Sequence, residues 1–398
     1  MSQFLEGRSL TMIKAKQAVS LCVLLLSSSN VVALDVKAPN LEEVLIIGSK
    51  EDKSKLAGSG IQIGQELIEK QSYTDLNQVI SMAPGVYVRE EDGYGLRPNI
   101  GIRGATAERS QKITIMEDGV LIAPAPYSAP AAYYITNAAR LHGLEVLKGP
   151  ASIQFGPHTV GGAVNLVTRP ASWQSFGELG YTAGTDNFQQ LLATSEFVGE
   201  NVSYMFDAMH YSSDGFKKLR NGADTGFKRG DFNVKVHWRP KTDLNQSVVL
   251  KIGYADEDSN ETYLGLTDDD FNKTPTLRYP ASQLDHFVSD HSQVHLSHNI
   301  DLENGIALKT KIYFNEFNRS WNKFDGFLVG PNAKLVLGSP NRYLAAYEVL
   351  AGLTDSASAG LTIDVTDNDR AYSSDGMQFG LSKQLSLGSF EHEVNLGV

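Results

Sequence analysis

The chain has 398 residues, a formal net charge of −11 and a single cysteine. The acidic balance argues against a nucleic-acid partner, and the lone Cys22 excludes an internal disulfide. The 36 glycines, 16 tyrosines and 17 phenylalanines are typical of a protein built from many short strands and turns.

The N-terminal segment has the features of a secretory signal peptide. Lys14 and Lys16 precede a short apolar run, AVSLCVLLL, and a Val-Val-Ala sequence ends at Ala33. We expect residues 1–33 to be removed on export, with Met12 as an alternative start. No other run in the sequence reaches the roughly 18 apolar residues that a spanning helix needs, so any membrane crossing must use strands.

The rest of the sequence divides into three zones. Residues 34–52 form a polar leader, residues 53–170 have the pattern of a compact α/β unit, and residues 172–398 contain alternating strands. In one of these strands, apolar Val234 and Val236 flank Lys235. A period of two places the two kinds of side chain on opposite faces. This alternation alone fits a soluble sandwich as well as a membrane barrel.

The connections between the expected strands alternate in length. Residues 239–245 contain Pro240 and Asp243 and predict a short turn, and Asn304-Gly305 predicts a tight hairpin. Residues 256–290 are long and polar, and predict an external loop. Alternate short and long connections are typical of outer-membrane barrels.

Five short sequence blocks follow one another between Thr74 and Pro170. They are Ala83-Pro84-Gly85-Val86, Ile100-Gly101-Ile102-Arg103-Gly104, Met116-Glu117-Asp118-Gly119-Val120, Glu145-Val146-Leu147-Lys148-Gly149-Pro150 and Gly161-Gly162-Ala163-Val164-Asn165. Their order resembles the plug domain of the TonB-dependent outer-membrane receptors, and five ordered blocks are a more specific signal than one motif. The resemblance implies an α+β plug domain followed by a transmembrane antiparallel β-barrel in the outer membrane of a Gram-negative bacterium.

The resemblance also implies a barrel size. Plugged transporters use about 22 strands, whereas residues 172–398 suffice for about ten. We therefore interpret the chain as a complete plug with about the first half of a 22-stranded barrel. Such a chain would be a C-terminally truncated fragment or a frameshifted product, and we expect that it cannot transport by itself. Outer-membrane lipid would surround its strands.

The leader contains a heptamer that resembles a TonB box, the extended segment that recruits TonB. The heptamer consists of Glu42, Glu43, Val44, Leu45, Ile46, Ile47 and Gly48. A short segment rich in β-branched residues can pair edge-on with a partner strand through backbone hydrogen bonds. The resemblance therefore implies the TonB complex of the inner membrane as a partner.

Two further segments resemble the ferric dicitrate receptor branch of the family. These are residues 261–268, ETYLGLTD, and residues 278–283, RYPASQ. The branch implies uptake of a ferric chelate, citrate-like, with the iron carried as cargo and no bound cofactor. An anionic chelate needs arginine or lysine with good carboxylate geometry. The candidate ligand-binding residues are Arg97, Arg109, Tyr127, Ser128, Arg278 and Arg319.

Other plug residues are expected to have structural roles. Arg103 and Glu145 are candidates for ion pairs that dock the plug in the barrel, because a buried pair is costly to break on one side. Glycines supply positive φ or close approach where strands turn. The remaining structural candidates are Gly104, Gly149, Pro150, Gly161 and Gly162.

Alternative functions remain open at this stage. The cargo could be a cobalamin or an oligosaccharide, or the chain could be an adhesin, a passive porin or a non-transporting receptor fragment. No nucleophile–base arrangement stands out, so an enzyme is not expected. A metal site is not expected either, because His291 and His295, four residues apart on a strand, would be about 13 Å apart.

Overall fold

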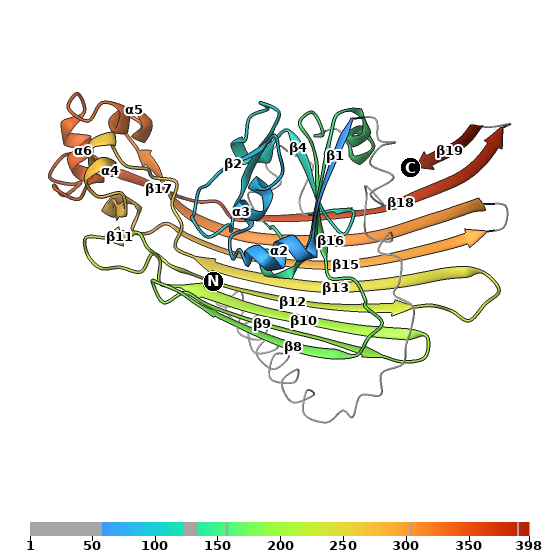
Figure 1. The fold of residues 1–398 in the computed structure, drawn as a ribbon. Helices are drawn as coiled ribbons and strands as arrows, with labels where there is room; N and C mark the ends of the chain where they lie inside the picture. The colour runs from blue at the N-terminus through green and yellow to red at the C-terminus, as the bar shows by residue number, and fades with distance from the viewer. Residues whose placement is uncertain (1–57, 123–133, 157, 303–304, 388–389, 398) are drawn as a thin grey trace.

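The computed structural model describes residues 58–122, 134–156, 158–302, 305–387 and 390–397. The predicted signal peptide, the TonB box and the candidate ligand residues Tyr127 and Ser128 lie outside this part of the chain. Figure 1 shows a small α/β unit lying against one face of a long, curved sheet. Each helix in the described ranges falls short of the length and apolar character needed to cross a bilayer.

The α/β unit contains the plug predicted from the five sequence blocks. Its elements are β1 (Ser59–Gly64), α2 (Gln65–Gln71), α3 (Leu76–Ser81), β2 (Val86–Arg89), β3 (Asn99–Ile102), η3 (Glu108–Ser110), β4 (Ile113–Glu117), β5 (Val120–Leu121), η5 (Ala138–Arg140), β6 (Leu141–Lys148), η6 (Pro150–Phe155) and β7 (Gly162–Thr168). Five strands form one sheet in the order β1-β6-β7-β4-β5, in which only the β4–β7 pair is parallel. Strands β2 and β3 form a separate hairpin.

The apolar core of the plug extends to the barrel wall, where it includes Phe287 and Phe317. Val79 and Ile80 of α3 pack with strand residues such as Val164, and all three are fully buried. Helix α3 begins where the carboxylate of Asp75 accepts a hydrogen bond from the backbone N–H of Asn77. Gly162 has φ +145°, and a Cβ there would lie 2.3 Å from the Leu147 carbonyl oxygen, so the β6–β7 pair needs glycine at this point.

The second part of the structure is a ten-stranded sheet. Its strands are β8 (Phe176–Ala183), β9 (Gln189–Val198), β10 (Val202–Ser213), β12 (Phe227–Trp238), β13 (Asn245–Ser259), β15 (His286–Leu302), β16 (Ile306–Phe327), β17 (Ile363–Asp367), β18 (Arg370–Leu387) and β19 (Phe390–Gly397). All neighbouring strands are antiparallel. Within the described residues β8 and β19 are the two edge strands, so the sheet is open and represents part of a barrel.

The polarity of the sheet distinguishes a membrane barrel from a soluble sandwich. Polar side chains point to the face that meets the plug, where Asn233 and Lys251 are almost completely buried and Lys251 contacts Asp118 of the plug. Apolar side chains point outward, where Ile252 is 46% and Phe314 58% exposed. A soluble sandwich would bury the apolar face, whereas a membrane barrel exposes it to lipid. The alternation therefore forms a barrel wall, and the sandwich alternative is wrong.

The connections differ in length at the two ends of the strands (Figure 1). Strands β12 and β13 are joined by the short turn predicted from Pro240 and Asp243. The predicted external loop at residues 256–290 is shorter than expected, because β13 continues to Ser259 and β15 begins at His286. The loop between them carries α4 (Asp268–Lys273), β14 (Leu277–Arg278) and η7 (Pro280–Ser282), and β14 pairs with β11 (Lys218–Leu219).

A helical insertion, residues 328–362, leaves the sheet at the same end as that loop. It connects β16 to β17 and contains α5 (Ala333–Gly338) and α6 (Leu344–Leu350). Figure 1 shows α4, α5 and α6 gathered in one lobe at the left, beyond the strand ends and beside the plug. The lobe packs against the loop that forms one wall of the cavity described below.

Candidate functional site

A two-residue turn of the plug presents two carboxylates to the barrel wall. Asp118 and Gly119 join β4 to β5, and both have positive φ, 52° and 72°. An Asp-Gly pair with this geometry is a favoured hairpin turn. The Asn165 side chain accepts a hydrogen bond from the Gly119 N–H at 2.8 Å and fixes the turn. Glu117 and Asp118 are thereby directed at the concave face of the sheet.

Glu117 is completely buried and fully engaged. One carboxylate oxygen accepts hydrogen bonds from Lys251 and, at 3.0 Å, from Gln293 of the barrel. The other accepts from Thr136 and, at 3.0 Å, from the Tyr134 hydroxyl of the plug. Burial alone would raise the pKa of Glu117, but the nearby lysine and Arg140 outweigh it and hold the pKa well below its usual range.

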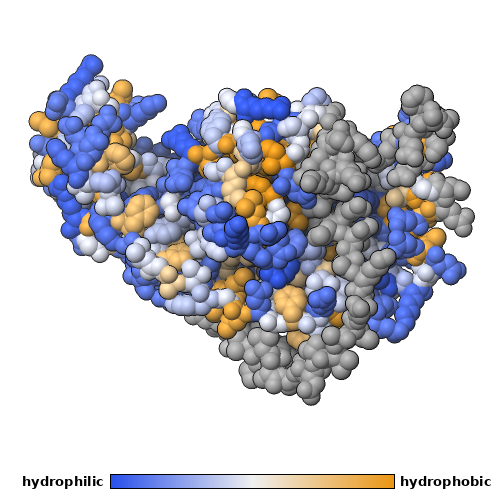
Figure 2. All heavy atoms as spheres, viewed as in Figure 1, coloured by the Kyte–Doolittle hydropathy of each residue, from blue (hydrophilic) through white to orange (hydrophobic). Residues whose placement is uncertain are grey.

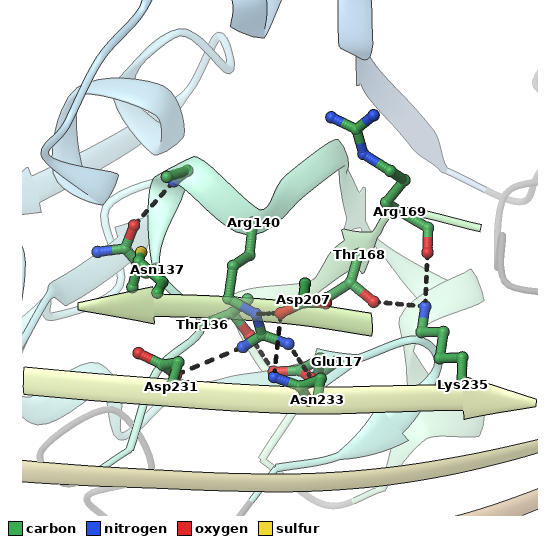
Figure 3. A network of polar contacts seen from close by, with 12 residues as sticks. Glu117, Thr136, Asn137, Arg140, Thr168, Arg169, Asp207, Asp231, Asn233 and Lys235 are labelled. Atoms are coloured by element: carbon green, nitrogen blue, oxygen red, sulfur yellow. Dashed lines mark hydrogen bonds and ion pairs between the residues drawn. The ribbon is translucent and has the colours of Figure 1, made fainter. Parts of the chain in front are cut away.

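Asp118 connects the plug to two lysines of the barrel. Its carboxylate lies 2.7 Å from the Lys251 ammonium and 3.2 Å from that of Lys235. It also accepts hydrogen bonds from the backbone N–H and the hydroxyl of Thr168. The Lys235 ammonium donates in turn to the Thr168 hydroxyl at 2.6 Å and to the Arg169 carbonyl at 2.9 Å (Figure 3).

Arg140 extends from the plug towards two carboxylates on neighbouring barrel strands (Figure 3). Its guanidinium lies 2.9 Å from Asp207 of β10 and 3.4 Å from Asp231 of β12. Arg229 of β12 pairs with Asp231 at 3.2 Å, and Glu117 lies 3.7 Å from Arg140.

We call this group of ion pairs the docking network. It consists of the carboxylates Glu117, Asp118, Asp207 and Asp231 and the cations Arg140, Arg229, Lys235 and Lys251. The charges balance, as a buried cluster requires, because an unpaired ion away from water is very costly.

A second anchor lies nearer the cavity. Arg97 of the plug is 1% exposed, forms an ion pair with Glu257 of β13, and donates to the Ser259 hydroxyl at 3.3 Å. Its guanidinium lies over the Phe287 ring at 4.3 Å, a cation–π arrangement. The Asp92 carboxylate accepts from the backbone N–H of Arg97 and shapes the loop that carries it. Arg97 is therefore a docking residue.

A cavity of about 510 Å³ lies between the plug and the loop that joins β13 to β15. Its floor is organised by Asn99, whose side chain donates to Glu91 at 2.9 Å and to the Arg89 carbonyl at 3.3 Å. The amide oxygen of the Asn99 side chain accepts a hydrogen bond from the backbone N–H of Arg109 at 2.8 Å. Arg109 has φ +50°. The side chains of Arg89 and Arg109 are exposed to the cavity.

The opposite wall of the cavity comes from the barrel loops. It includes Lys217, Tyr263, Leu264, Leu266, Phe271, Leu277 and Arg278. The Arg109 guanidinium lies 5.9 Å from the Tyr263 ring centre, so the plug and the loop meet at this point. Figure 2 shows a notch between the helical lobe and the plug, and apolar patches among the polar surface of that lobe.

The four described arginines that we predicted to bind ligand lie in different places in the structure. Arg109 and Arg278 line the cavity. The Arg278 guanidinium, however, donates to Ser282 and to the Asn260 carbonyl, which leaves Arg109 as the more available of the two. Arg97 is buried in the second anchor and does not line the cavity. Arg319 is also buried, lies over Trp321, and does not line this cavity.

The two residues proposed for plug docking lie at different depths in the structure. Arg103 is exposed at φ +51° and forms no ion pair within the described part of the chain. Glu145 is buried in the plug sheet and accepts from Asn165 at 2.8 Å. The sequence analysis missed Glu117 and Asp118, which form ion pairs with barrel lysines. Two features of the sequence could have indicated this role. Two adjacent acids lie at an Asp-Gly turn, and the alternation of the barrel strands predicts that the lysines point into the lumen.

A plug that docks through buried ion pairs against a wall that is polar inside and apolar outside defines a plugged barrel of the outer membrane. Residues 52–163 match the family model of the TonB-dependent Receptor Plug Domain. Residues 52–163 are thus a plug domain of the kind found in the TonB-dependent receptors, and a barrel sheet follows them in the chain. The resemblance found in the sequence is thereby confirmed.

Two relatives align with different shares of this chain. The vitamin B12 transporter BtuB of Vibrio vulnificus (strain CMCP6) is 21% identical over 364 residues, which are 89% of this chain and 55% of BtuB. The ferric enterobactin receptor of Pseudomonas aeruginosa is 26% identical over 209 residues, covering 48% of this chain and 26% of that receptor.

The solved structure of the unliganded ferric citrate transporter FecA has the same fold. It aligns with a TM-score of 0.66 and 19% identity, covering 92% of this chain and 50% of FecA. The chain therefore spans about half the length of BtuB and of FecA. These relatives are transporters and receptors by name, and not enzymes.

The docking network predicts the effect of removing Lys251. In Lys251→Met, Glu117 and Asp118 lose their shared cation, and we expect a loss of about 3–5 kcal/mol, the cost of breaking a buried ion pair on one side. Urea unfolding in lipid vesicles measures this loss. Lys309→Met is the matched control, because Lys309 is exposed and forms no ion pair within the described ranges. Equal stability of the two variants would contradict the role of the network.

Proposed function

We propose that the protein is a TonB-dependent receptor for a ferric chelate of the citrate type, which binds in the cavity between the plug and the β13–β15 loop. The carrying observation is the cavity itself, which has exposed arginines on a floor that belongs to the plug. Its volume of about 510 Å³ is within the usual range for small-molecule sites. A ligand there would touch both the plug and the barrel loop.

The charges around the cavity support an anionic ligand. Arg89 and Arg109 are exposed to it, whereas Lys217 is already paired with Glu261 at 2.7 Å. Four cations line the cavity, Lys217 and Arg278 included, against the three acids Glu90, Glu91 and Glu108, and burial raises the pKa of Glu91. A guanidinium matches the geometry of a carboxylate pair. A ferric citrate complex presents such carboxylates.

A second cargo is supported by one comparison. The relative that covers 89% of this chain is named a vitamin B12 transporter. Cobalamin uptake is therefore the alternative that experiments should include. The two cargoes make different demands, because a citrate complex would depend on the charge of Arg109, whereas cobalamin would depend chiefly on shape and apolar contact.

Removal of the Arg109 guanidinium tests the cargo. We expect Arg109→Ala to weaken ferric dicitrate binding by roughly tenfold or more, the loss of one hydrogen bond to a charged group. Lys112→Ala, which removes an exposed plug cation outside the cavity, should bind like the wild type. Tryptophan fluorescence titrations with ferric dicitrate and with cyanocobalamin measure both. Binding of cyanocobalamin alone would refute the citrate proposal and favour the alternative.

Deletion of the TonB box tests the transport mechanism. The predicted box, residues 42–48, is proposed to leave the plug when ligand binds and to engage TonB, which then displaces the plug. We expect the deletion to abolish uptake of labelled ferric citrate by cells that carry the complete receptor, and to leave binding at the cell surface unchanged. Uptake that continues without the box would show that this segment does not recruit TonB.

A further inference from the structure

The apolar wall of the cavity is supported from behind by the helical lobe. Leu264, Leu266 and Leu277 line the cavity. The same three leucines pack against a buried cluster in the lobe that includes Val336 of α5 and Leu350 of α6. The position of the wall is therefore determined by a segment, residues 328–362, from which no residue lines the cavity.

One carboxylate joins the loop to the lobe. Asp270 of α4 accepts hydrogen bonds from the hydroxyl of Tyr279, beyond β14, and from that of Tyr347 on α6 at 2.8 Å. The Tyr279 ring is almost completely buried and meets the Tyr347 ring edge-on at 6.3 Å between centroids. We call Asp270, Tyr279 and Tyr347 the tyrosine clamp. It connects positions 270, 279 and 347, which are far apart in the sequence.

The clamp is suited to remain closed at neutral pH. Burial would raise the pKa of Asp270, but hydrogen bonds from Tyr279, Tyr347 and Thr267 outweigh it and keep the pKa below its usual range. Burial and the hydrogen bond to Asp270 raise the pKa of Tyr347 to about 12. The acceptor is thus ionised and the donor protonated over the physiological range.

The Asp270 carboxylate is directed at the hydroxyls of Tyr279 and Tyr347. It does not line the cavity, whereas its neighbour Phe271 does and is 57% exposed. Because Asp270 is next to Phe271 in the chain, its hydrogen bonds fix the position of Phe271. Its hydrogen bond with Tyr279 also fixes the segment that carries Leu277. Ordering a loop before binding improves affinity because the ligand no longer has to supply the ordering.

We propose that Asp270 is a positioning residue for ligand binding, because the tyrosine clamp holds the cavity wall of the β13–β15 loop against the helical lobe. The effect on ligand binding rests on the proposed function, whereas the effect on the order of the loop does not. It assigns the helical insertion, residues 328–362, the role of a brace.

The test compares three variants of the protein purified in detergent. Asp270→Ala removes the acceptor, Tyr347→Phe removes one donor, and Asp269→Ala removes an exposed acid from the same helix as the control. Hydrogen–deuterium exchange of residues 260–285 reports the order of the loop, and titration with ferric dicitrate reports affinity. We expect Asp270→Ala to speed exchange and to raise the Kd about tenfold, Tyr347→Phe to raise it about threefold, and Asp269→Ala to change neither.

The outcomes separate this proposal from the proposed cargo. Unchanged exchange in Asp270→Ala, or faster exchange with an unchanged Kd, would overturn the positioning role. If wild-type protein does not bind ferric dicitrate, the cargo is wrong, and the exchange measurement still decides whether Asp270 orders the loop. If Asp270→Ala does not fold, Tyr347→Phe decides, because it removes a single hydroxyl.

Discussion

The structure depends on one constraint: charges removed from water between the plug and the barrel must be neutralised by one another. Many side chains that line the barrel lumen are polar, and the plug fills the lumen, so the charges at their contact have lost their water. The balanced docking network meets this requirement with carboxylates and cations from both parts. Such a network is costly to break on one side. Apolar contacts add to it, because Leu96 of the plug packs with Met209 and Phe227 of the barrel.

The two anchors have different surroundings. The docking network lies where the β4–β5 turn meets the middle of strands β12 and β13, and the Tyr134 ring lies 5.5 Å from its Arg229 guanidinium. The Arg97 anchor adds the aromatic rings of Phe287 and Trp321 and lies in the same loop region as the cavity floor. A ligand that contacts Arg109 and Asn99 therefore acts close to the Arg97 anchor, since Asn99 follows Arg97 by two residues. This proximity gives ligand binding a direct route to the docking of the plug.

Much of this architecture could be predicted from the sequence. The ordered blocks predicted the plug, and the period-two alternation gave the two faces of the wall, although it could not say which face met lipid. That choice became clear only when Asn233 and Lys251 were found buried and Ile252 exposed. The end of β13 was missed because its inward-facing Glu257 and Ser259 resemble loop residues in a linear sequence. In a lumen filled by a plug, polar residues are interior residues.

The pairings within the site could not be predicted. Glu117 and Lys251 are separated by 134 positions, and the sequence of neither segment predicts that the two residues pair. Arg97 was expected to bind ligand because an anionic chelate needs arginine, but Glu257 and the aromatic rings bury it. The tyrosine clamp was equally hidden, because Tyr347 belongs to a helical insertion inside a region of strands. Contacts between distant segments were therefore the part that required the structure.

The most direct test of the docking network is a double-mutant cycle between Arg140 and Asp207, which contact each other across the plug–barrel interface at 2.9 Å. The cycle uses Arg140→Leu, Asp207→Leu and the double variant, with the free energy of unfolding measured by urea in lipid vesicles. We predict a coupling energy of about 2 kcal/mol or more, as expected for a buried charge pair in contact. A coupling energy near zero would show that the plug is not held in the barrel by these ion pairs.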